Sequence, residues 1–190
     1  MQLPYVPLFY SRNSGYGRCS ITYIMTTNEY SWIHDSLMSK LILELNSLEI
    51  TDVVARKTAE HLFPGAVLLF WGNMGAGKTT FAKSLCAGLG IPHETVISPT
   101  YTMVNIYSGK WTILHVDLFR LTAPEQLDDF DREDLFADDG ITMVEWPGFI
   151  TDHLTDEPVL NLYFKTVSEY QRQLIIKSEF DNFDTLLKTL

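Results

Sequence analysis

The sequence predicts an α/β fold, in which helices cover a mixed sheet that has a parallel centre and an antiparallel C-terminal hairpin. Three observations predict it. Val67–Trp71 is apolar at every position, as a central parallel strand buried on both faces must be. A glycine-rich turn and a helical pattern follow this strand directly. Two further apolar runs, at residues 112–116 and 141–144, each end at an acidic residue. With 190 residues and 46% hydrophobic content, the chain is sized for one well-filled domain.

The first half of the domain is predicted as strand, helix, strand and helix. Residues 40–45 alternate as a strand does. Thr51 is the predicted N-cap of the first helix, and the sequence at residues 63–65, Phe-Pro-Gly, breaks the chain after it. The helix after the glycine-rich turn is predicted to end at Gly90 and Pro92. The apolar faces are Val54, Ala55, Thr58, Ala59 and Leu62 in the first helix, and Phe81, Leu85, Cys86 and Leu89 in the second.

The second half is predicted to be rich in strands. We expect them at residues 103–107, 112–116, 141–144, 159–164 and 173–177. The last two, joined through residues 167–170, predict an antiparallel hairpin at one edge of the sheet. Residues 181–190 are predicted to form a closing helix.

The N-terminal residues 1–37 are predicted to lie outside the domain. Their first 24 residues contain Arg12 and Arg18 but no acid, and they scatter Pro, Gly, Ser and Tyr without helical or strand periodicity. We interpret this segment as a disordered or dispensable extension, or as a start codon placed too early. A weak organellar transit peptide is the alternative. The domain is then expected at residues 38–190.

Charge and cysteine content argue against several classes of protein. The formal charge of −10, from 14 Lys and Arg against 24 Asp and Glu, opposes unaided docking on nucleic acid or on an anionic membrane. No apolar run approaches the roughly 20 residues that a membrane-spanning helix needs. Cys19 and Cys86 belong to no metal-ligand spacing, which fits a reducing cytosol. We expect a cytoplasmic protein whose polyanionic substrates, if any, arrive on a partner.

A phosphate-binding loop is the most specific motif in the chain. Residues 72–79, Gly-Asn-Met-Gly-Ala-Gly-Lys-Thr, match GxxxxGK[ST] between a predicted strand and a predicted helix, as the motif requires. Glycines let backbone N–H groups point inward around phosphates, and the helix adds its positive N-terminal end. Lys78 is expected to reach the β and γ phosphates of ATP, and the Thr79 hydroxyl to ligate Mg²⁺. The fold is therefore predicted as a P-loop NTPase-like three-layer sandwich, with a single nucleotide-binding domain.

Two acids and a threonine are candidates to complete a magnesium site. Asp117 and Glu145 each follow an apolar strand, and the carboxyl ends of strands in open α/β sheets lie at the edge that carries the loop. The alternative for each is a solvated strand-end charge or a helix cap. Thr100 follows Ser98 and Pro99 in a loop where switch-type NTPases place a hydroxyl that senses Mg²⁺ and the γ phosphate. A plain turn is the alternative there.

The remaining polar and aromatic candidates receive weaker assignments. Trp146 is interpreted as a core aromatic, with a wall beside the nucleotide as the alternative. None of the five histidines (His34, His61, His93, His115 and His153) has a paired ligand spacing, and none is assigned a ligand role. One acidic segment is expected to form an exposed helix and loop, with a solvated face as the default and a partner contact second. Its acids are Asp128, Asp129, Asp131, Glu133, Asp134, Asp138 and Asp139.

Four motifs in order resemble the TsaE family, the P-loop ATPases of tRNA threonylcarbamoyladenosine formation. They are the loop at residues 72–79, Ser-Pro-Thr-Tyr at 98–101, His-Val-Asp-Leu-Phe-Arg at 115–120 and Glu-Trp-Pro at 145–147. The resemblance covers about residues 40–178. It implies a bacterial cytoplasmic ATPase that uses ATP and Mg²⁺ and works with a TsaB–TsaD type protein complex, with tRNA bound only indirectly and no membrane contact.

The resemblance also implies roles for individual residues. Glu145, Asp117 and Lys78 would be catalytic, and Thr79, Asp117 and Glu145 would hold Mg²⁺. Trp146 would flank the nucleotide, and Thr100 would lie in the switch-like loop. The full nucleotide-binding set is Asn73, Met74, Gly75, Ala76, Gly77, Lys78, Thr79, Thr80, Thr100 and Trp146. The chain departs from the family at Asn73, where Asp is usual, and at Asp131, where Gly is usual; the first removes a negative charge near the nucleotide.

Two other functions are compatible with the same loop. One is a small-molecule or nucleotide kinase, although only Arg120, Arg132 and Arg172 follow the loop to cover a second set of phosphates. The other is a non-catalytic nucleotide switch that regulates a partner. The sequence does not separate such a switch from a partner-activated ATPase.

Overall fold

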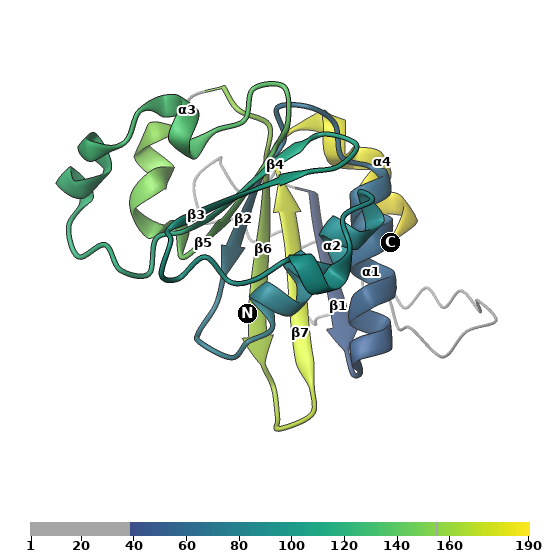
Figure 1. Ribbon diagram of the computed structural model, residues 1–190. Helices are drawn as coiled ribbons and strands as arrows, with labels where there is room; N and C mark the ends of the chain where they lie inside the picture. Colours follow the sequence, from purple (N-terminus) through teal and green to yellow (C-terminus); the bar gives the residue numbers. More distant parts are fainter. Residues whose placement is uncertain (1–38, 155) are drawn as a thin grey trace, which may run out of the picture.

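The computed structural model describes residues 39–154 and 156–190, so the predicted extension at residues 1–37 lies outside the described residues. This part of the chain forms one seven-stranded mixed sheet with the strand order β1-β7-β6-β2-β5-β4-β3 (Figure 1). The strands are β1 (Ser39–Leu45), β2 (Val67–Trp71), β3 (Val104–Ser108), β4 (Thr112–Asp117), β5 (Ile141–Glu145), β6 (Val159–Thr166) and β7 (Arg172–Ser178).

The predicted parallel centre is confirmed. Strands β6, β2, β5 and β4 run parallel, and Val67 of β2 pairs with Val159 of β6 on one side and with Thr142 of β5 on the other. β2 is therefore a central strand, and its alternate side chains enter the hydrophobic clusters on the two faces of the sheet, which explains why its sequence is apolar at every position. β3 adds to β4 in the antiparallel direction and forms one edge of the sheet.

The antiparallel hairpin of β6 and β7 is confirmed, but its predicted position at the sheet edge is wrong. β1 pairs antiparallel with β7 along its whole length, from Ser39 opposite Ser178 to Leu45 opposite Arg172, and β1 is the edge strand. This pairing joins segments from opposite ends of the described chain. Local sequence pattern carries no information about such a distant partner.

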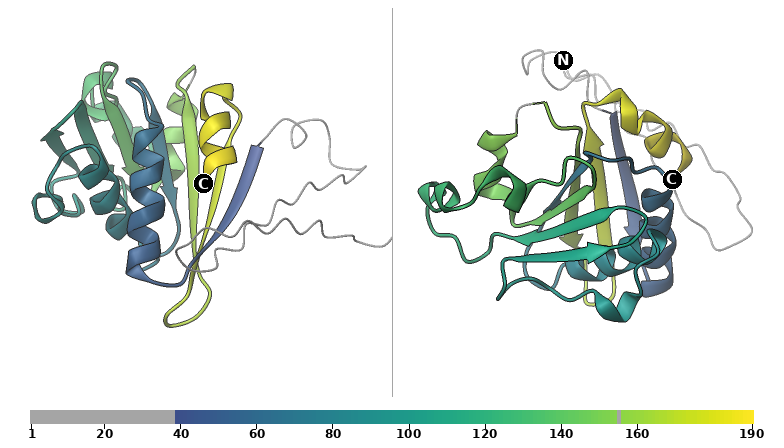
Figure 2. Two further views of the ribbon diagram at one scale, coloured as in Figure 1. Left: turned by 90° about the vertical axis from the view of Figure 1, so that its right-hand side faces the viewer. Right: turned by 45° about the horizontal axis from the view of Figure 1, so that its top comes forward.

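Helices cover both faces of the sheet, as the three-layer prediction requires. One face is covered by α1 (Leu48–Glu60), α2 (Lys78–Gly88) and α4 (Asp184–Thr189), and α1 and α2 pack side by side (Figures 1 and 2). Edge-to-face contacts among Phe70, Phe81 and Phe164, with centroids 5.4–6.1 Å apart, hold α2 against β2 and β6. The other face is covered by short helices: η2 (Pro124–Asp129), α3 (Arg132–Leu135) and η3 (Pro147–His153).

The predicted N-cap of α1 is wrong, because the helix begins at Leu48, three residues before Thr51. Ser47 is the N-cap: its backbone is extended and its hydroxyl oxygen accepts a hydrogen bond from the N–H of Ile50 at 3.2 Å. Thr51 lies in the first turn, where its hydroxyl donates to the Ser47 carbonyl at 2.9 Å. Serine and threonine are both good N-caps, and here the serine, which is nearer the end of β1, is the N-cap.

Most other predicted bounds shift by one or two residues. β3 begins at Val104 rather than at 103, and the predicted closing helix divides into η4 (Asp181–Phe183) and α4. β4 and β5 each extend one residue beyond the prediction, so Asp117 and Glu145 are the last residues of their strands. Among the described residues, no helix has the length and apolar character to cross a membrane.

Candidate functional site

The carboxyl ends of β2, β4 and β5 open into one cleft with a volume of about 210 Å³. Parallel strands place their carboxyl ends at the same edge of a sheet, and the register sets Asp117 of β4 beside Glu145 of β5. The loop between β2 and α2 borders this edge. The cleft is lined by Met74, Gly75, Gly77, Lys78, Thr79, Thr80, Ser98, Thr100, Asp117, Phe119, Glu145 and Trp146.

Glycines give the loop its shape at two positions. Gly72 has φ 140°, and a Cβ atom there would lie 2.5 Å from the carbonyl oxygen of Phe164, so no larger residue fits. Gly77 has φ 106°, in the left-handed region, and is the N-cap of α2. The first-turn N–H groups of α2 have no partners within the helix, and they adjoin the loop. The loop and helix therefore form a site suited to anions.

Lys78 lies on the inner side of this loop and is only 4% exposed. Its Nζ donates hydrogen bonds to the carbonyl oxygens of Gly72 at 2.9 Å and Asn73 at 3.1 Å. The same atom lies 4.2 Å from the centroid of the Trp146 ring. Burial lowers the pKa of Lys78, and the carboxylates of Glu145 and Asp117 partly oppose that shift.

Glu145 is held by two side chains from different elements. Its Oε1 accepts a hydrogen bond from the Thr79 hydroxyl at 2.8 Å and lies 3.2 Å from Nε2 of His115. His115 is fully buried, and its Nδ1 has no hydrogen-bond partner among the described residues. The ring proton is therefore assigned to Nε2, which donates to Glu145. Because both donors reach the same oxygen, they fix the rotation of the carboxylate group.

Asp117 has a separate set of donors. Its Oδ2 accepts from the Thr100 hydroxyl at 2.7 Å, and its Oδ1 accepts from the backbone N–H of Phe119 at 2.9 Å. The Thr100 hydroxyl is also 2.8 Å from the hydroxyl of Ser98. The loop after α2 is thereby joined to the end of β4 by the Thr100 side chain, and the backbone N–H of Asp117 adds a second contact by donating to the carbonyl of Met103 at 2.8 Å.

Trp146 lies at the wall of the cleft, and the interpretation of it as a core residue is wrong. The side chain is only partly buried, and its ring lies 5.0 Å from the ring of Phe119 as well as over Lys78. Its backbone has φ 58° and ψ 52°, a left-handed conformation that is uncommon for a large residue. This turn at the end of β5 directs the ring to the cleft.

Most of the residues predicted for the site lie around this cleft, and their roles stay predictions. Asn73 and Ala76 do not line it: Asn73 is exposed and contributes its carbonyl to Lys78, and Ala76 is buried. The sequence analysis assigned no role to His115, which contacts Glu145, or to Phe119, which lines the cleft, although both lie in the motif at residues 115–120. A signal for His115 was available, because a residue two positions before Asp117 on a strand has its side chain on the same face.

The fold and the cleft together define the class of this protein. A loop with these glycines, set between a central parallel strand and a helix whose first residue is lysine, is the phosphate-binding arrangement of P-loop proteins. The acids at the ends of the neighbouring strands complete the arrangement.

Comparison with known proteins gives the family. The model of the family described as "Threonylcarbamoyl adenosine biosynthesis protein TsaE" matches residues 45–174. A relative from Bacillus subtilis, named tRNA threonylcarbamoyladenosine biosynthesis protein TsaE, is 32% identical over 143 residues, which cover 75% of this chain and 88% of the relative. A relative of the same name from Synechocystis is 41% identical over 111 residues, which cover 54% of this chain and 68% of the relative. The chain belongs to the TsaE family, as its motifs predict.

A solved structure agrees with this membership. The crystal structure of Bacillus subtilis YdiB superimposes with a TM-score of 0.62 and 27% sequence identity, covering 80% of this chain and 93% of that one. The predicted fold class, a mixed α/β sheet with a parallel centre, is confirmed by the sheet and by this neighbour.

Proposed function

We propose that this chain binds ATP with Mg²⁺ in the cleft and hydrolyses it, and that this cycle acts on a TsaB–TsaD type complex while threonylcarbamoyladenosine is formed in tRNA. Membership of the TsaE family supports the role in threonylcarbamoyladenosine biosynthesis. The observation that carries the ATPase part is the hydrogen bond of Thr79 with Glu145 at 2.8 Å, beside Lys78. It joins the phosphate-binding loop to a strand-end carboxylate.

The donors in the cleft fit a magnesium ion. The Thr79 hydroxyl and the carboxylates of Asp117 and Glu145 are hard oxygen ligands, and the two carboxylates are only 1% and 3% exposed. A triphosphate would add negative charge to a cleft where Lys78 is the one cation among the lining residues, so a divalent cation is needed to offset it. Mg²⁺ usually takes one or two carboxylates together with the phosphates of its nucleotide, and bound there it would neutralise charge on the phosphates.

Each of the other side chains has a defined task in hydrolysis. Lys78 would replace its bonds to the loop carbonyls with bonds to β and γ phosphate oxygens, and the loop N–H groups would hold the rest of the phosphate tail. Glu145, fixed by Thr79 and His115, would orient the attacking water and take its proton as the oxygen bonds to the γ phosphorus. The bond from that phosphorus to the bridging oxygen breaks, and ADP leaves with the electron pair.

Thr100 and Trp146 have supporting tasks. Thr100, bonded to Asp117, would report the presence of the γ phosphate to the loop that carries it, which supports a cycle read by a partner. Trp146 would flank the nucleotide with its ring.

The test is ATP hydrolysis by the purified chain, alone and with a matched TsaB–TsaD complex, with and without substrate tRNA. Lys78→Ala is the blank. Stimulation by the complex that is lost in the blank supports the proposal. Intact ATP binding with no stimulation would refute the partner-coupled part, and phosphoryl transfer to an added small acceptor at kinase rates would favour the kinase alternative.

A further inference from the structure

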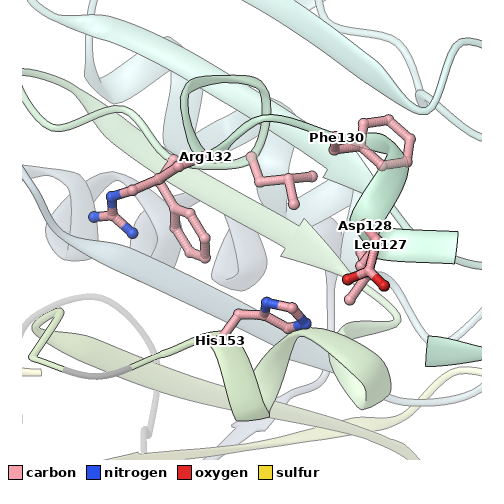
Figure 3. Close-up of a pocket in the computed structure, with 7 residues that line it drawn as sticks. Leu127, Asp128, Phe130, Arg132 and His153 are labelled. Carbon is pink, nitrogen blue, oxygen red and sulfur yellow. The ribbon is translucent and has the colours of Figure 1, made fainter. Parts of the chain in front are cut away.

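A second and larger cavity, of about 370 Å³, lies over the other face of the sheet (Figure 3). We call it the acidic groove. It is lined by Leu127, Asp128, Phe130, Arg132, Leu135, Phe136 and His153, which come from η2, α3, η3 and the residues that follow η2 and α3. In Figure 3, Arg132 and Asp128 lie on opposite sides of the open space and His153 lies between them. None of these residues lines the nucleotide cleft.

The floor of the acidic groove is apolar. Leu127, Leu135 and Phe136 are 2%, 4% and 6% exposed and belong to the hydrophobic cluster that packs on this face of the sheet. Phe130 is only partly buried and stands at the side. A side chain that entered the groove would therefore contact the core of this layer. Burial in the groove would remove an aliphatic or aromatic side chain from water, which favours its binding.

The surroundings of the groove are strongly negative. Residues 121–140 contain one basic residue, Arg132, and its charge is already offset: it pairs with Asp138 at 3.2 Å and with Glu157 at 2.8 Å, and its guanidinium lies 4.8 Å from the Phe136 ring centroid. The acids of the same stretch are Glu125, Asp128, Asp129, Asp131, Glu133, Asp134, Asp138 and Asp139. Of these acids only Asp128 lines the groove, but all eight are exposed on the segment that supplies most of its lining. The surface beside this apolar cavity is therefore complementary to an apolar side chain flanked by Lys or Arg.

We propose that the acidic groove docks a Lys- and Arg-rich segment of a partner protein, which inserts one apolar side chain over Leu127, Leu135 and Phe136. The inference rests on the proposed function, since the partner is then the TsaB–TsaD type complex. Phosphate-bearing partners, nucleic acid or membrane, are repelled by the exposed acids of this segment. A second copy of this chain would present the same acidic stretch and be repelled as well.

The acidic groove is physically linked to the nucleotide cleft. η3 begins at Pro147, directly after Trp146 in the cleft wall, and ends at His153 in the groove. Ile150 in the middle of η3 is fully buried in the same cluster as Leu127, so η3 cannot shift without disturbing the groove floor. A segment docked in the groove would therefore affect, through η3, the position of the turn that carries Trp146, next to Glu145. This is a direct route from partner binding to hydrolysis.

The first test measures affinity for the TsaB–TsaD complex by calorimetry in the presence of ATP. Asp128→Lys with Asp129→Lys reverses charge at the groove, and both side chains are exposed. Glu60→Lys with Glu179→Lys makes the same change in net charge at exposed sites outside residues 121–140 and is the matched control. We expect the groove variant to bind at least tenfold more weakly, the control to stay within twofold of wild type, and ATP binding to be equal in all three.

The outcomes separate the two proposals. If the wild type binds the complex and both charge variants weaken binding equally, or neither does, the acidic groove is not the docking site and the proposed function stands. If the wild type does not bind the complex in any nucleotide state, the proposed partner and this inference both fail.

The second test identifies the occupant by photo-crosslinking. With p-benzoylphenylalanine in place of Phe130, at the side of the groove, we expect a crosslink to a TsaB or TsaD segment that contains Lys or Arg beside an apolar residue. A crosslink to tRNA, to another part of this chain or to a second copy of it would overturn the proposal.

Discussion

Replacing His115 with phenylalanine should separate folding from hydrolysis. The ring is fully buried, its Nε2 lies 3.2 Å from Oε1 of Glu145, and its Nδ1 has no partner among the described residues. Removing a donor to a charged acceptor costs about 1.5–3 kcal/mol, and removing a buried polar atom that has no partner recovers about 1–3 kcal/mol. The two effects oppose each other, so the free energy of unfolding should change by no more than about 2 kcal/mol in either direction.

The rate of ATP hydrolysis should fall in this variant, because removing the unpaired Nδ1 atom does nothing to restore the position of Glu145. If His115 fixes Glu145 for the attack of water, the loss of about 1.5–3 kcal/mol lowers kcat by roughly ten- to a hundredfold, because each 1.36 kcal/mol is a factor of ten. The KM for ATP should stay unchanged, since His115 does not line the cleft.

The assay combines urea unfolding with steady-state ATP hydrolysis in the presence of the TsaB–TsaD complex. His115→Gln is the matched variant, because its side-chain amide keeps a donor in reach of Glu145, and it should restore most of the lost kcat. The reasoning is refuted if the phenylalanine variant turns over within twofold of wild type, or if both variants lose kcat equally.

Three further predictions concern the loop and the core. Because burial lowers the pKa of Lys78, its charge is lost at a lower pH than that of an ordinary lysine. ATP affinity should therefore weaken as the pH rises into that range. Equilibrium ATP titrations of the Lys78→Ala variant at several pH values should lack this dependence. Gly72→Ala, with a Cβ 2.5 Å from a backbone oxygen, should lower stability by about 2–4 kcal/mol, whereas Gly75→Ala, with φ 75° and open space, should cost about 1–2 kcal/mol in thermal unfolding. Burial raises the pKa of Cys86 to about 12, so in a Cys19→Ser background Ellman's reagent should react at pH 8 only after urea is added.

Each of these three predictions can be contradicted by its measurement. Identical pH profiles for wild type and Lys78→Ala, equal melting temperatures for the two glycine variants, or rapid reaction of the folded chain with Ellman's reagent would contradict the corresponding argument.

The sequence predicted the centre of the fold well, because local signals there are strong. The all-apolar run Val67–Trp71 predicts a strand buried on both faces, and the glycines and Lys78 that follow it match a phosphate-binding loop. Asp117 and Glu145 were expected at one sheet edge because strand ends in a parallel sheet share an edge, and their register as neighbours agrees.

The failures have two causes: contacts with distant parts of the chain, and local backbone conformation that a sequence pattern does not show. The β6–β7 hairpin was placed at the edge because nothing near it in sequence indicates β1 as a further neighbour. From the residues alone Trp146 was assigned to the core, because spacing does not separate a core aromatic from a cleft wall and its left-handed backbone conformation is not visible in a pattern. The family resemblance, in contrast, placed it beside the nucleotide. His115 was dismissed for lack of metal-ligand spacing, although its partner is a carboxylate 30 residues away.

The pairing of β1 with β7 also has a consequence for biosynthesis. The two strands are separated by about 130 residues. A ribosome adds about 5–20 residues per second, so β7 is synthesised roughly seven to twenty-five seconds after β1. During that interval Leu41, Leu43 and Leu45, all buried in the finished sheet, have no β7 to pack beside. The delay favours chaperone binding at residues 39–45, and a chain interrupted before residue 172 would keep this apolar strand open to aggregation.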